Sequence, residues 1–118
     1  MIIKFKGKNR DIKLKSVRKI RKFTGLMFRT KNTENLLFNF SEFESKNIHS
    51  FFVFFDFMAI WLNNRNKVLK VDLVKPFTIL IKAPEKTRKL IELPINNSNK
   101  DLIEFFVDKR EKFKYPRI

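Results

Sequence analysis

The sequence predicts a small, mainly β domain of the α+β class, with a compact antiparallel sheet and one or two short helices. Three observations favour it: apolar and charged residues alternate near the N-terminus, short apolar runs recur between polar segments, and an asparagine-rich turn joins two of these runs. A chain of 118 residues has the length of a single domain. With 15 Phe and 43% hydrophobic residues, it can bury a core without a disulfide.

Residues 1–31 are predicted to form two strands and a helix. Apolar and basic residues alternate around Ile3 and again around Ile12, which predicts a hairpin that turns between residues 7 and 11 and carries its lysines on one solvated face. After Ser16, which suits a helix N-cap, the apolar spacing becomes helical. The expected apolar side of this helix consists of Val17, Ile20, Phe23 or Thr24, and Met27.

The rest of the chain is expected to add strands and a final helix. The aromatic run at residues 51–62 indicates a buried strand segment, with contact to a membrane surface or a partner as its alternative. Residues 63–66 (NNRN) suit a hairpin turn, because Asn tolerates positive φ. The other expected elements are an apolar run at 36–40, strands at 68–74, 77–82 and 90–93, a helical turn at 86–89, and a helix from 101 to about 112 capped by Asn97, Ser98 or Asn99.

Charge is concentrated at the N-terminal end. The chain carries 27 Lys and Arg against 12 Asp and Glu, a net charge of +15. An abundance of Lys, Asn, Ile and Phe is typical of an AT-rich genome, but such a bias would spread the lysines evenly. Residues 1–31 instead hold twelve bases and one acid, a net +11, which favours a surface that binds a polyanion. The predicted nucleic-acid-binding residues are Lys4, Lys6, Lys8, Lys13, Lys15, Arg18, Lys19, Arg21, Lys22 and Arg29.

Several chemistries are disfavoured. Without Cys and with His49 as its only histidine, the chain offers no zinc ligand set, and no cofactor or metal is expected. A triad of His49, Ser50 and Asp56 is weighed and set aside, because adjacent strand residues point to opposite faces. The carboxylates show no spacing typical of a magnesium site, and no catalytic residue is predicted. The charged N-terminus is unlike a signal peptide and no transmembrane segment is expected, so a cytoplasmic location is expected.

Six segments occur in a familiar order: GLMFR at 25–29, LLFNF at 36–40, IHSFFVFF at 48–55, the hairpin around Trp61, VKPFT at 74–78 and IELP at 91–94. Together they resemble the family called domain of unknown function 192 (DUF 192), in its archaeal branch, over about residues 12–94. The resemblance implies a curled, barrel-like antiparallel sheet, and it brings no established reaction. The chain departs from the family pattern at Asp56, Met58 and Asn66, where the family has Pro, Asp and a turn Gly.

Two of these motifs contribute Arg29 and Glu92, which we expect to form a buried or half-buried ion pair; the alternative is that Arg29 binds an anion. For the whole chain we expect a nucleic-acid-binding domain that contacts phosphates. About 6–10 such contacts would lower its affinity roughly 10³–10⁵-fold between 50 and 200 mM salt. The alternatives are a structural or protein-interaction domain and an enzyme such as a nuclease.

Overall fold

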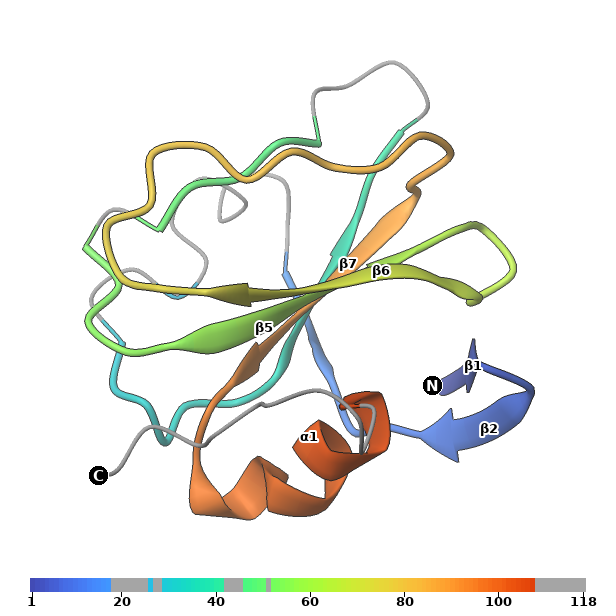
Figure 1. Ribbon diagram of the computed structural model, residues 1–118, viewed down its shortest axis with the longest axis horizontal. Coiled ribbons are helices and arrows are strands. Elements are labelled where there is room, and N and C mark those ends of the chain that lie inside the picture. The colour runs from blue at the N-terminus through green and yellow to red at the C-terminus, as the bar shows by residue number, and fades with distance from the viewer. Residues whose placement is uncertain (18–25, 27–28, 42–45, 51, 108–118) are drawn as a thin grey trace.

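A computed structural model describes residues 1–17, 26, 29–41, 46–50 and 52–107. These residues form two β-sheets, one short α-helix and one turn of 3₁₀ helix (Figure 1). The strands are β1 (Ile2–Phe5), β2 (Lys8–Asp11), β3 (Lys15–Ser16), β4 (Leu36–Asn39), β5 (Phe57–Leu62), β6 (Val68–Val74) and β7 (Lys89–Pro94), followed by the 3₁₀ turn η2 (Asn97–Asn99) and the helix α1 (Lys100–Phe106).

The larger sheet has the strand order β3-β4-β7-β5-β6 and is antiparallel except for the short β3–β4 pair. Its two outer strands, β3 and β6, do not pair with each other, so the sheet is open within the described residues. The mainly β prediction is therefore confirmed, whereas a closed barrel is not seen.

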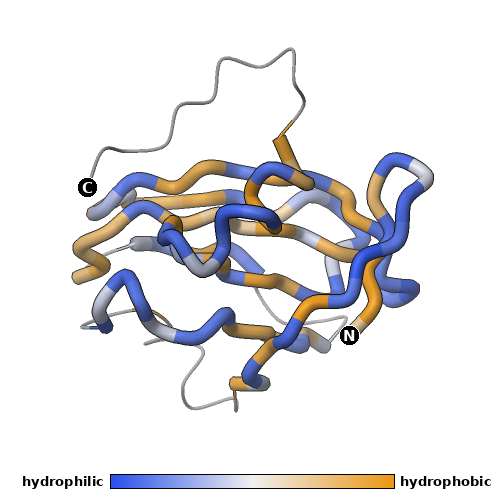
Figure 2. The backbone as a smooth tube through the Cα atoms, turned by 90° about the horizontal axis from the view of Figure 1, so that it is seen from below, coloured by the Kyte–Doolittle hydropathy of each residue, from blue (hydrophilic) through white to orange (hydrophobic). Residues whose placement is uncertain are grey.

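The core lies on both faces of this sheet. Side chains such as Ile60 and Ile91 point to one face, where they pack with α1 and the β1–β2 hairpin. Their neighbours in sequence, such as Trp61 and Leu90, point to the other face, which the loops cover. Figure 2 shows apolar residues running along the strands and polar ones concentrated in the connections. Both faces of the central strands are buried, which explains why β5 is apolar at every position.

The N-terminal hairpin differs from the prediction in its turn. Phe5 pairs with Lys8, so Lys6 and Gly7 alone make the turn, and both have positive φ (49° and 76°). This is the backbone of a two-residue turn whose twist matches that of the strands. The predicted single lysine face is wrong, because Lys4 lies on one face and Lys8 on the other, beside Phe5.

Ser16 is not a helix cap. It lies in β3 and pairs with Leu37 of β4, and the next amide, that of Val17, donates to the Leu37 carbonyl at 2.9 Å. The remainder of the helix predicted after Ser16 lies outside the described residues.

The predicted hairpin around residues 63–66 is confirmed as β5–β6, with Asn66 at φ 63°. The strand predicted at 90–93 is β7, and the predicted final helix corresponds to α1, preceded by η2. Two expectations are wrong. Residues 77–80 form a loop rather than a strand, and within it Phe77 and Thr78 bond to Ser50. Residues 86–88 form no helix.

Candidate functional site

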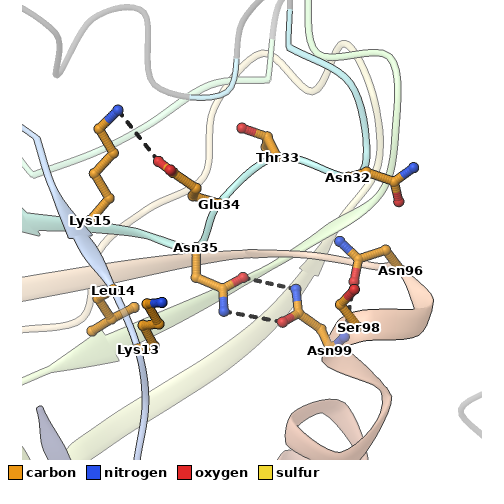
Figure 3. A pocket seen from close by; sticks show the side chains of 10 residues that line it. All are labelled: Lys13, Leu14, Lys15, Asn32, Thr33, Glu34, Asn35, Asn96, Ser98 and Asn99. Atoms are coloured by element: carbon orange, nitrogen blue, oxygen red, sulfur yellow. Dashed lines mark hydrogen bonds and ion pairs between the residues drawn. The ribbon is translucent and has the colours of Figure 1, made fainter.

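A polar hollow of about 450 Å³ lies where the segment leading into β4 meets the segment leading into α1 (Figure 3). Two of the predicted binding residues, Lys13 and Lys15, lie at its edge, and both are exposed. We call it the asparagine hollow. Its lining consists of Lys13, Leu14, Lys15, Asn32, Thr33, Glu34, Asn35, Asn96, Ser98 and Asn99.

Hydrogen bonds between asparagine side chains join the two segments that form the hollow. The side chains of Asn35 and Asn99 form two hydrogen bonds with each other, at 3.1 and 2.8 Å, across 64 residues of sequence (Figure 3). Asn99 also donates to the Pro94 carbonyl at 2.8 Å. Asn96 accepts from the Asn99 backbone amide at 2.9 Å and donates to the Lys31 carbonyl at 2.6 Å. These amides are therefore used to hold the wall in place.

The groups that face solvent in the hollow are those that a ligand would meet. Lys13, Asn32 and Ser98 are exposed. Lys15 lies 3.4 Å from the carboxylate of Glu34, which is itself 63% exposed, so part of the local positive charge is offset. The hollow offers two ammonium groups and several neutral donors, a set that suits phosphate oxygens better than it suits a metal ion.

Arg29 lies beside the hollow and connects it to a buried acid. Its guanidinium donates to the Thr33 hydroxyl at 3.2 Å. Burial raises the pKa of Glu92 to about 8, and the charge of Arg29 lowers that pKa only in part. The charge of Arg29 therefore acts on Glu92, but a pKa of about 8 keeps Glu92 mainly protonated at neutral pH, so the predicted ion pair is not confirmed. Among the residues that the structure describes, the Oε1 atom of Glu92 has no hydrogen-bond partner.

The other predicted binding residues lie elsewhere. Lys4 and Lys8 are exposed on the β1–β2 hairpin, and the Lys6 ammonium lies 5.1 Å from the centre of the Phe5 ring. Ile3 and Ile12 are fully buried and anchor the hairpin. Residue 12 alone lies between Asp11, the last residue of the hairpin, and Lys13, the first residue that lines the hollow. Four predicted residues lie outside the described part of the chain: Arg18, Lys19, Arg21 and Lys22.

The structure gives no support to the catalytic triad or the metal site considered from the sequence. The Ser50 hydroxyl is fully buried and donates to the Lys75 carbonyl at 2.6 Å, so it is not placed as a nucleophile. Asp56 forms an ion pair with Lys75 at 2.6 Å. Within the described residues no group of three or more His, Asp or Glu side chains could hold a metal ion. In the same part of the chain, no helix is long and apolar enough to cross a membrane.

Sequence reasoning missed the asparagine hollow and an exposed aromatic cluster. Asn97, Ser98 or Asn99 was expected to cap the final helix. Asn99 does occupy the N-cap position of α1, but its side chain makes no capping bond there, and the side-chain cap that forms is that of Asn96 on η2. Nothing in the sequence links these residues to Asn35. The rings of Phe52 and Phe54 were expected in the core and Phe77 in a strand, yet the three residues are 47%, 62% and 48% exposed.

No family model and no curated protein matches the sequence. The fold does have a solved counterpart. It is similar to the crystal structure, at 1.22 Å resolution, of a protein of unknown function from Novosphingobium aromaticivorans, with a TM-score of 0.68 over 86% of this chain and 74% of that one. At 14% identity the similarity shows a shared fold and carries no information on function.

Proposed function

We propose that this domain binds the phosphate backbone of nucleic acid through the basic surface of its N-terminal segment. The observation that carries the proposal is the exposure of all five lysines among residues 1–17, in a segment that contains a single acid. We name them the N-terminal lysines: Lys4, Lys6, Lys8, Lys13 and Lys15.

The arrangement supports contacts to phosphates rather than to bases. Lys4, Lys6 and Lys8 extend from a short hairpin, Lys13 from the connection that follows it, and Lys15 from β3. Lysine is a compact point charge on a flexible stem, so it neutralises phosphates without fixing their orientation. Weak sequence preference and strong salt dependence are therefore expected.

The test is a binding titration with a 20-base-pair duplex at several salt concentrations. Five phosphate contacts predict a loss of affinity of about 500-fold between 50 and 200 mM salt. Reversing the charge of Lys4, Lys6 and Lys13 together should remove most of the binding and reduce the salt slope. A matched control reverses three exposed lysines outside the segment, Lys70, Lys82 and Lys86.

Equal losses in the two triple variants would mean that net charge alone matters and would refute a defined surface. Purification free of nucleic acid, with no binding at 50 mM salt, would favour the alternative of a protein-interaction domain. We also propose that the chain belongs to the DUF 192 family, on the strength of its six ordered motifs; this adds no reaction to the proposal.

A further inference from the structure

The asparagine hollow has two chemically different ends, one on each side of the paired asparagine amides (Figure 3). The ammonium groups of Lys13 and Lys15 lie on one side. The exposed amide of Asn32 and the exposed hydroxyl of Ser98 lie on the other. The backbone supports this arrangement, because the Lys15 amide donates to the Asn35 carbonyl at 2.9 Å and so holds Lys15 beside the start of β4. One end of the hollow is therefore cationic, and the other is neutral and polar.

The groups at both ends are available to a ligand. Lys13, Asn32 and Ser98 are exposed, and none of these side chains has a hydrogen bond or ion pair with another residue that the structure describes. The Thr33 hydroxyl also lines the hollow and accepts from the Arg29 guanidinium at 3.2 Å, so its own proton is left for a ligand. A ligand can thus bind Lys13, Asn32 and Ser98 without displacing a partner from the described part of the chain.

The charge around the hollow suits a doubly charged anion. Residues 11–17, 29–36 and 94–104 form the hollow and its surroundings, to one turn into α1. With the N-terminal ammonium, which pairs with Asp11 at 3.0 Å, they carry six positive groups and four carboxylates, a net +2. Glu34 is the one acid of the lining, and it is paired with Lys15 at 3.4 Å. A phosphomonoester carries a charge of about −1.5 to −2 at pH 7, which matches this surplus, whereas a phosphate within a nucleic-acid strand carries a single charge.

The size of the hollow favours a nucleotide over a bare phosphate ion. Its volume of about 450 Å³ is typical of sites for small molecules and leaves room for a sugar and a base beside the phosphate. The amide and hydroxyl groups at the neutral end suit the hydroxyls of a sugar and the polar edge of a base. A phosphate inside a duplex has a further nucleotide on either side, so it meets the exposed lysines without entering the hollow. The last nucleotide of a strand has one free side and can enter.

We infer that the asparagine hollow binds a nucleotide that carries a phosphomonoester, either as the last nucleotide of a strand or as a free nucleoside monophosphate. The phosphate contacts the ammonium groups of Lys13 and Lys15, and the nucleoside meets Asn32, Thr33 and Ser98. The inference rests on the proposed function, because it uses two of the N-terminal lysines, and it adds a ligand group that the interior of a duplex lacks.

The first measurement compares ligands that differ only in the phosphate. In calorimetry of the full chain at low salt, adenosine 5′-monophosphate should bind about tenfold more tightly than adenosine, because the charge-assisted contacts are lost without the phosphate. A short single strand should likewise bind about tenfold more tightly with a phosphate at its 5′ or 3′ end than with none. A gain seen only with the free nucleotide supports that source, and a gain seen only with the strand supports the strand end.

Variants test the position of the site. Lys13→Gln should remove most of the gain from the terminal phosphate. Its matched control, Lys4→Gln on the hairpin, should weaken both strands equally and keep that gain. Ser98→Ala should weaken binding of adenosine 5′-monophosphate by about threefold to tenfold, whereas Asn97→Ala, which changes an exposed neighbour outside the lining, should leave it unchanged.

The inference is overturned if the phosphate improves the affinity of neither the nucleoside nor the strand, or if Lys13→Gln and Lys4→Gln act alike. A duplex without terminal phosphates separates this result from the proposed function. Salt-dependent duplex binding without any gain from a terminal phosphate refutes the nucleotide site alone. A gain from the phosphate without duplex binding refutes the proposed function alone.

Discussion

Replacing Glu92 by Gln should stabilise the protein at neutral pH. Glu92 lies on the central strand β7, is 6% exposed, and has a folded-state pKa of about 8 against 4.5 for an ordinary glutamate. Burial is the main cause, because the ionised form loses its hydration. Since the pKa is raised on folding, the unfolded chain releases this proton near pH 4.5 while the folded chain retains it up to about pH 8.

The sign and size of the change in unfolding free energy follow from the difference in proton binding between the folded and unfolded chain. Stability from this group is fully present below pH 4.5 and is lost as the pH rises toward 8. One pKa unit corresponds to about 1.4 kcal/mol, so the loss amounts to about 3 kcal/mol at pH 7 and about 4 kcal/mol at pH 8. Gln resembles the protonated acid in shape and does not titrate, so the Glu92→Gln variant avoids this loss.

The assay is urea unfolding of both proteins at pH 4, 7 and 8. The difference in unfolding free energy isolates Glu92, because every other titrating group is shared. We expect the difference to move in favour of Gln by about 3 kcal/mol between pH 4 and 7. The exposed Glu104 on α1 supplies the control, and Glu104→Gln should give a difference that is nearly independent of pH. If Glu92 is instead ionised and paired with Arg29, the Gln variant loses stability as the pH rises, and the reasoning is refuted.

Two further predictions concern hydrogen bonds that join distant segments. Asn99→Ala removes three side-chain hydrogen bonds and leaves the Asn35 amide and the Pro94 carbonyl without these partners. The free energy of unfolding, measured in urea, should therefore fall by about 2–4 kcal/mol. A fall below about 0.5 kcal/mol would show that water replaces the lost bonds. Ser50→Ala removes the hydroxyl that bridges the loop before β5 and the loop after β6, through the Lys75 carbonyl and the Thr78 amide. The substitution should cost about 1–3 kcal/mol and speed hydrogen exchange at the Thr78 amide. Unchanged exchange at Thr78 would contradict the bridging role.

Residue patterns within a short segment predicted those elements that form through contacts within the same segment. The β5–β6 hairpin follows from alternation and from an asparagine at a position of positive φ, and Asn66 does adopt it. The turn of the first hairpin was misplaced because two alternating stretches were paired directly, although Lys6 and Gly7 already provide a two-residue turn. The lysines were then assigned to the wrong faces, since a change of register changes which residues share a face.

Segments whose conformation depends on contacts with residues far away in the sequence were not predictable from local patterns. The segment PFTILIK at 76–82 has the composition of a strand, yet Phe77 and Thr78 bond to Ser50 and Ile81 bonds to Ile48, and none of these partners belongs to a strand of the sheet. The exposure of Phe52, Phe54 and Phe77 depends on the contacts of Ser50, which join residues 25 to 28 apart in sequence. Composition predicts that these residues are apolar, whereas their burial is decided by which segment reaches them.

The two acids of the central sheet show the same dependence on sheet position. Leu36, Glu92, Ala59 and Asp72 form one row across β4, β7, β5 and β6, so both acids project on the same face, on either side of Ala59. Asp72 lies on the outer strand, is 22% exposed, accepts from the Trp61 indole at 2.9 Å and lies 3.3 Å from the Lys70 ammonium. Glu92 lies in the middle of the sheet, and its Oε1 atom has no hydrogen-bond partner in the described part of the chain. In the sequence both are acids within apolar strands; strand order alone makes one a satisfied surface group and the other a buried acid that lowers stability at neutral pH.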